Sequence, residues 1–171
     1  MRQSLRTIIA AAMAAAFATA TPAHSQDSEA LVGFNSMKPE LAVELAQAAV
    51  AHCRDAGYQV AVAVVDRFGQ TQAVIRDRYA GVHTVDTAIA KAWTAASFRT
   101  ATLELDRGIE AGTLSKSLRD IPGALILGGG VPVAAAGSII GAVGVSGAPG
   151  PEIDEGCAKA GIAAISERLE F

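Results

Sequence analysis

The residues best suited to chemistry are His83, Lys91 and Asp154, which carry an imidazole, an ammonium and a carboxylate. His83 directly precedes a predicted helix and follows the loop sequence Tyr79-Ala80-Gly81, so its ring can reach a pocket beside that loop. Neutral imidazole binds metal ions and transfers protons near neutral pH. The alternative is a solvent-facing loop histidine, and the sequence leaves both interpretations open.

Lys91 is the only charged residue between Asp86 and Arg99, in a segment rich in alanine. An ammonium in such a segment can pair with the carboxylate of a ligand or of an acidic side chain. The alternative is a lysine on the solvated face of a helix, which is the commoner place for this residue type. Both interpretations stay open at this point.

Two acids and a cysteine, Asp154, Glu155 and Cys157, lie near the start of the last predicted helix. Paired carboxylates close to an imidazole and a thiol can bind a metal ion or move protons. The alternative treats the acids as partners of the helix dipole and the cysteine as a core residue. We favour that alternative for Glu155 and Cys157, and we keep Asp154 as a candidate. One function that the sequence allows is therefore an enzyme acting on a small carboxylate or aromatic, with His83 and Asp154 as acid and base.

The N-terminal 25 residues are typical of a secretory signal peptide. Arg2 and Arg6 supply the positive charge, Thr7–Ala20 is apolar, and Ala23-His24-Ser25 fits a small-x-small cleavage site. We therefore predict a signal peptide over 1–25, a flexible leader over 26–37 and a single domain over 38–171. The expected location is periplasmic or extracellular, where cysteines can be oxidised.

Charge and hydropathy exclude two classes of partner for the mature chain. Without Arg2 and Arg6, 12 basic residues face 17 acidic ones, a formal charge of −5, and no basic patch for nucleic acid occurs. The long uncharged stretch from Gly123 to Gly147 is interrupted by glycines and Pro132 at the spacing of turns. It therefore predicts consecutive buried strands and no transmembrane segment.

Hydrophobic periodicity predicts an α+β domain with a five-stranded antiparallel sheet. A helix begins at Pro39 and ends near Gly57, with a buried stripe through Leu41, Leu45, Ala49 and Cys53. Further helices are expected over Thr84–Arg99, around Leu103–Glu110 and from about Ile153. The expected strands are Tyr58–Asp66, Gln70–Arg76, Ala124–Leu127, Val131–Ala136 and Ile139–Val145.

The two cysteines, Cys53 and Cys157, lie near the end of the first predicted helix and near the start of the last. If these helices pack antiparallel on one face of the sheet, the two sulfurs can meet and form a disulfide. The alternative is a pair of buried free thiols, and the sequence does not decide between them.

Five short motifs occur in a fixed order along most of the mature chain. They are VVDRFG at 64–69, AKAWTA at 90–95, GGGVPV at 128–133, IGAVGVSG at 140–147 and DExCA at 154–158. Together they resemble the haem-binding family of GlcG/HbpS type, and also the C-terminal domain of PduO-type corrinoid adenosyltransferases. The resemblance implies a profilin-like fold, with helices on both faces of a five-stranded antiparallel sheet. It also implies a homo-oligomer, often an octamer.

Some members of the family bind or degrade haem, so the resemblance implies an exported haem-binding protein: a carrier, a store or an accessory sensor. His83 is then the expected ligand of the haem iron, Lys91 the partner of a propionate and Tyr79 a pocket residue. His52 could be a second ligand, but a half-buried helix histidine is the favoured interpretation. No CxxCH motif occurs, which excludes covalent haem of the c type. A third alternative is an oligomeric assembly module without a small ligand.

Overall fold

The computed structural model describes residues 30–169, so the predicted signal peptide lies outside the described residues. The helices and strands all belong to the unit that begins at Phe34. None of the helices within 30–169 is long and apolar enough to cross a membrane. The elements in chain order are α1 (Pro39–Asp55), β1 (Ala61–Asp66), β2 (Thr71–Arg76), α2 (Thr84–Phe98), α3 (Thr102–Glu110), η1 (Lys116–Asp120), β3 (Gly130–Ala135), β4 (Ser138–Ser146), α4 (Pro151–Ala164) and η2 (Ser166–Arg168).

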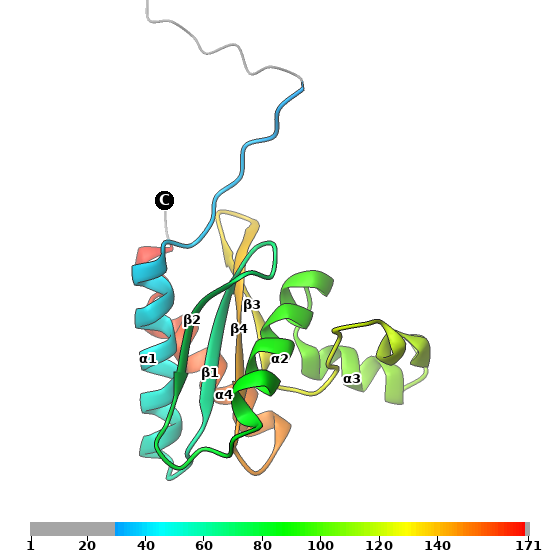
Figure 1. Cartoon of the computed structure of the whole chain (residues 1–171). Helices are drawn as coiled ribbons and strands as arrows, with labels where there is room; N and C mark the ends of the chain where they lie inside the picture. The colour runs from blue at the N-terminus through cyan, green and yellow to red at the C-terminus, as the bar shows by residue number, and fades with distance from the viewer. Residues whose placement is uncertain (1–29, 170–171) are drawn as a thin grey trace, which may run out of the picture. The chain divides into compact units, whose positions relative to one another are not determined.

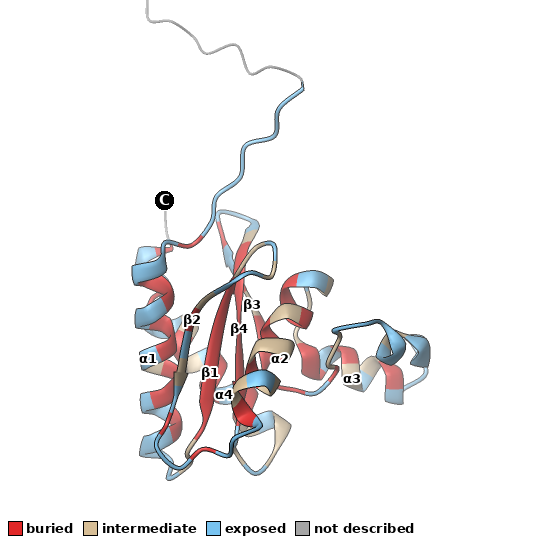
Figure 2. Cartoon of the chain, viewed as in Figure 1, coloured by how far each residue is buried: buried red, intermediate tan, exposed pale blue. Residues whose placement is uncertain are grey.

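The described part of the chain forms one antiparallel sheet with the strand order β2-β1-β4-β3 (Figure 1). Helices α1 and α4 pack together on one face, and α2 covers the other. The two central strands, β1 and β4, are buried along nearly all of their length, whereas the edge strand β2 is largely open to solvent (Figure 2). The predicted α+β class with an antiparallel sheet is confirmed.

The prediction of five strands is wrong, because Ala124–Leu127 forms no strand. The backbone N–H of Leu125 donates to Thr94 Oγ1 of α2 at 2.8 Å. Ile126 is buried against Leu105 and Ile109 of α3. Ile126 is buried on a helix and Leu127 is exposed, and a short apolar run cannot distinguish this arrangement from strand burial. The profilin-like classification stays a prediction.

The two faces of the sheet differ in side-chain size because alternate residues of a strand point to opposite faces. In β1, Val62 and Val64 pack in the core shared with α1 and α4, whereas Ala61 and Ala63 pack against Ala88 of α2. Small residues let α2 lie very close to the sheet. A Cβ atom added to Gly144 of β4 would lie 2.1 Å from the carbonyl oxygen of Ala88.

Helix α1 follows its sequence prediction closely. Pro39 occupies the first turn, where its missing N–H costs no hydrogen bond, and Gly57 follows the helix with a φ of 87°. The predicted stripe through Leu41, Leu45, Ala49 and Cys53 is buried. The opposite face is solvated, and His52 lies there exposed rather than half-buried as predicted.

Met37 belongs to the packed core, although the sequence predicts a flexible leader over 26–37. Its side chain is buried, and its carbonyl oxygen accepts a hydrogen bond from Gln72 Nε2 at 2.9 Å. Its backbone N–H donates to the carbonyl of Ile140 at 3.4 Å. The packing of the domain therefore begins before the first helix.

Candidate functional site

A pocket of about 690 Å³ opens between α2, the loop that precedes it, and the connection from β4 to α4. Its volume lies within the range of small-molecule sites. The four residues singled out from the sequence, Tyr79, His83, Lys91 and Asp154, all line it. The other lining residues are Gly57, Tyr58, Gln59, Gly81, Thr84, Thr87, Leu125, Leu127, Ser146, Gly147, Ala148, Pro149, Gly150 and Pro151.

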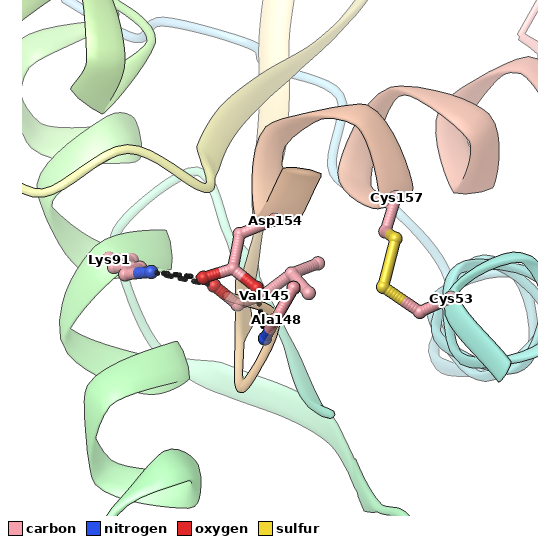
Figure 3. Close-up of a disulfide and its surroundings, with 6 residues drawn as sticks. All are labelled: Cys53, Lys91, Val145, Ala148, Asp154 and Cys157. Carbon is pink, nitrogen blue, oxygen red and sulfur yellow. Dashed lines mark hydrogen bonds and ion pairs between the residues drawn. A yellow bond between two sulfur atoms is a disulfide. The ribbon is translucent and has the colours of Figure 1, made fainter. Parts of the chain in front are cut away.

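Lys91 reaches from α2 across the end of β4 to the first turn of α4 (Figure 3). Its Nζ donates to Asp154 Oδ2 at 2.8 Å and to the carbonyl oxygen of Val145 at 3.0 Å. The residue is only 1% exposed, so the interpretation as a lysine on a solvated helix face is wrong. Its partner is the acidic side chain of Asp154, one of the two kinds of partner predicted from the sequence.

Asp154 links three parts of the fold. Besides accepting from Lys91, its carboxylate accepts a hydrogen bond from the backbone N–H of Ala148 at 3.0 Å through Oδ1. Burial raises the pKa of Asp154 above its ordinary value of 3.8, and the hydrogen bond and charge of Lys91 act in the opposite direction. The pocket thus has a polar floor in which a buried carboxylate and an ammonium neutralise each other.

His83 lies at the N-cap position of α2, where its carbonyl oxygen accepts from the hydroxyl of Thr87 at 2.8 Å. Its exposed imidazole lies beside Gly81, since a Cβ added to that glycine would be 2.8 Å from His83 Cε1. Among residues 30–169, no side chain or backbone group forms a hydrogen bond to this ring. The imidazole therefore lines the pocket and is also open to solvent, and Tyr79, which lines the same pocket, is 80% exposed.

The acidic cluster around α4 does not assemble into a metal site. Within the described chain, no group of three or more histidine, cysteine, aspartate or glutamate side chains is placed to hold a metal ion. Glu155 is buried outside the pocket and pairs with Lys159 at 2.6 Å. His52 does not line the pocket either.

Cys53 and Cys157 form a disulfide between α1 and α4, with their Cα atoms 5.5 Å apart. Both residues are buried in the core on the face of the sheet opposite α2. The structure thus decides between the two alternatives that the sequence left open, because α1 and α4 pack against each other as the disulfide requires.

Ser146 also lines the pocket and is not among the residues predicted from the sequence. It is the last residue of β4 and pairs with Ala61, on the face that α2 covers. Its signal in the sequence is that it is the first polar residue after the apolar run of the strand. That signal marks a strand end but does not reveal that a pocket lies there.

Comparison with known proteins decides the family. Residues 37–163 match the family described as "Haem degrading protein HbpS-like". The chain belongs to the HbpS-like family. The crystal structure of a double mutant of HbpS from Streptomyces reticuli is 38% identical with a TM-score of 0.75, over 85% of this chain and 97% of that one. This membership confirms the resemblance drawn from the five motifs.

Two further relatives extend the comparison. The structure of a PduOC:heme complex is 30% identical with a TM-score of 0.70, covering 76% of this chain and 95% of that chain. An uncharacterized 15.0 kDa protein of Citrobacter freundii, from the dhaT-dhaS intergenic region, is 36% identical over 108 residues, which are 62% of this chain and 76% of that protein. HbpS-like relatives thus include a protein whose structure contains haem, which supports a haem-related function.

Proposed function

We propose that this HbpS-like protein is an exported haem-binding protein, acting as a carrier, a store or an accessory sensor, and that it binds haem in the pocket beside His83. The observation that carries the proposal is the exposed His83 at the edge of a pocket of about 690 Å³. Imidazole is a common ligand of haem iron, and the volume suits a cofactor of this class. The PduOC:heme complex supports the choice of ligand.

The residues present fit haem in a particular way. His83 is the group that would hold the iron, and Tyr79 would line the site next to it. Asp154 already neutralises Lys91, so that lysine offers no free charge to a propionate. We propose that Lys91 and Asp154 instead form the fixed polar end of the pocket, which excludes charged groups of the ligand from its floor.

We propose export on the strength of the N-terminal sequence, and the Cys53–Cys157 disulfide supports it. Disulfides persist in the periplasm and outside the cell, whereas thiols are kept reduced in the cytosol. We also propose a closed homo-oligomer, with the octamer as the candidate size, because the family resemblance implies it. Light scattering that gives a monomeric mass at micromolar concentration would contradict the assembly.

The test of haem binding is a titration with haemin, followed through the Soret band. We expect stoichiometric binding by the wild-type protein, and we expect His83→Ala to shift the band and weaken the complex because the iron loses a ligand. His52→Ala is the matched control, since that residue is also exposed but lies outside the pocket. An unchanged spectrum and affinity in His83→Ala would exclude His83 as the iron ligand. Absence of haemin binding by the wild-type protein would exclude haem as the ligand of the pocket.

A second candidate function is an enzyme that acts on a small carboxylate or aromatic. The observation in its favour is that His83 and Asp154 line one pocket and that burial raises the pKa of Asp154. A carboxyl group with a raised pKa is suited to acid–base work near neutral pH. Absent haemin binding, together with saturable binding of a small carboxylate that His83→Ala abolishes, would favour this function.

A further inference from the structure

Helix α4 is held on two sides within a single turn. Asp154 accepts from Lys91 of α2, and Cys157, three residues later, is bonded to Cys53 of α1. Figure 3 shows the two side chains leaving α4 toward different neighbours. Residues three apart in a helix are separated by less than one turn, so their relative position is rigid. A displacement at Cys157 is therefore transmitted to the carboxylate of Asp154.

The second half of α4 has a different attachment to α1. Gly161 lies so close to α1 that an added Cβ would be 2.9 Å from the carbonyl oxygen of Leu45 and 2.8 Å from Ala49 Cβ. This close packing requires no covalent bond. The disulfide thus attaches the half of α4 that lines the pocket, and direct packing attaches the half that does not.

We propose that the Cys53–Cys157 disulfide is a positioning bridge for the pocket. It fixes the first turns of α4 and holds the Asp154 carboxylate between Lys91 Nζ and the backbone N–H of Ala148. The bridge acts through Asp154 and touches no ligand itself, since neither cysteine lines the pocket. The consequence for ligand affinity rests on the proposed function, whereas the consequence for the Asp154 contacts does not.

The first test measures those contacts without any ligand. The amide of Ala148 donates to Asp154 Oδ1, so its hydrogen exchange reports whether the carboxylate stays in place. In Cys53→Ala/Cys157→Ala we expect this amide to exchange about tenfold faster or more, relative to amides of the central strand β1. Gly161→Ala is the matched control, because it disturbs the other attachment of α4 and leaves the bridge intact. We expect it to leave that ratio unchanged.

If the double cysteine variant does not fold, the same measurement is made in trimethylamine N-oxide, which favours compact states. It is also made on wild-type protein reduced by dithiothreitol. In that reaction each cysteine sulfur gains an electron and a proton, and dithiothreitol becomes a cyclic disulfide. An Ala148 amide that exchanges no faster once the bridge is open, or that responds equally to Gly161→Ala, overturns the proposal.

The second test uses haemin and a double-mutant cycle. We expect removal of the bridge to weaken haemin binding about fivefold in the wild-type background and to have no further effect in Asp154→Asn, because both changes act through one carboxylate. If removal of the bridge and Asp154→Asn weaken haemin binding additively, the bridge does not act through Asp154. A wild-type protein that binds no haemin would remove the proposed function, and the Ala148 exchange would still decide the role of the bridge.

Discussion

The two faces of the sheet differ in the size and polarity of the side chains that they bury. The face covered by α1 and α4 holds one large cluster in which leucine, valine and isoleucine outnumber alanine, and a buried disulfide lies within it. The face covered by α2 holds smaller clusters made mostly of alanine, together with the buried pair Lys91 and Asp154. The first face contributes apolar area, and the second contributes close backbone approach and a polar pocket.

The contrast between the two faces separates the residues that mainly stabilise the fold from those that also shape the pocket. Burial of large side chains stabilises the folded state in proportion to apolar area. Small residues bury less area, but they bring α2 close enough to the end of β4 for Lys91 to reach the carbonyl of Val145. Substitutions on the α1 face, apart from the Cys53–Cys157 bridge that we propose positions Asp154, should therefore change mainly the free energy of unfolding, whereas those beside α2 should also change the pocket.

The largest effect is expected from the disulfide on the α1 face. Cys53→Ala/Cys157→Ala should lower the free energy of unfolding by about 4–5 kcal/mol, because the bridge restricts an unfolded loop of about 100 residues. The sequence separation of the two cysteines is 104 residues. Urea unfolding of both proteins measures the difference. A thiol titration of unfolded, unreduced wild type that finds free thiols would contradict the bridge itself.

A smaller loss is expected from Gly144→Ala on the α2 face. The added Cβ would lie 2.1 Å from the carbonyl oxygen of Ala88, so α2 must move away from the sheet. Overpacking of this kind costs about 1–3 kcal/mol, measured by urea unfolding. Gly156→Ala is the control, since nothing lies within 4 Å of its added Cβ. Equal stability of the two variants would mean that close approach of α2 is not required.

The smallest effect is expected in the pH dependence of the free energy of unfolding, to which two buried aspartates contribute with opposite signs. On the α1 side, the hydrogen bond from Arg54 lowers the pKa of Asp77, so its stabilisation is present above pH 3.8 and is lost as pH falls through the folded pKa. On the α2 side, burial raises the pKa of Asp154. Its contribution is complete below pH 3.8 and is lost as pH rises through the folded pKa.

Asp77→Asn and Asp154→Asn should therefore change the pH dependence of unfolding in opposite directions. The stability of wild type relative to Asp77→Asn should rise with pH, and that relative to Asp154→Asn should fall. Chemical unfolding at several pH values between acid and neutral measures both differences. If both stability differences change with pH in the same direction, Lys91 has a larger effect than burial on the pKa of Asp154.

The sequence predicted local features better than long-range ones. Pro39 and the four-residue spacing of the α1 stripe located that helix, and the position of His83 before α2 placed it correctly beside a pocket. The burial of Lys91 was not predictable, because its partner Asp154 lies 63 residues away and belongs to another helix. The pairing of Cys53 with Cys157 could not be decided from the sequence for the same reason, because the two residues are 104 positions apart. Ala124–Leu127 was misassigned because burial on a helix and burial in a sheet select the same side chains.

The position of the disulfide determines whether the fragments stay together after a protease cuts the chain. The four strands of the described sheet, and the helices α2 and α3, lie between Cys53 and Cys157 in the sequence. The exposed stretch around η1 is the kind of surface segment at which proteolytic cuts concentrate. A single cut there leaves both fragments joined by the bridge, with each still holding part of one hydrophobic core. A nicked molecule can therefore keep its two halves together until the disulfide is reduced.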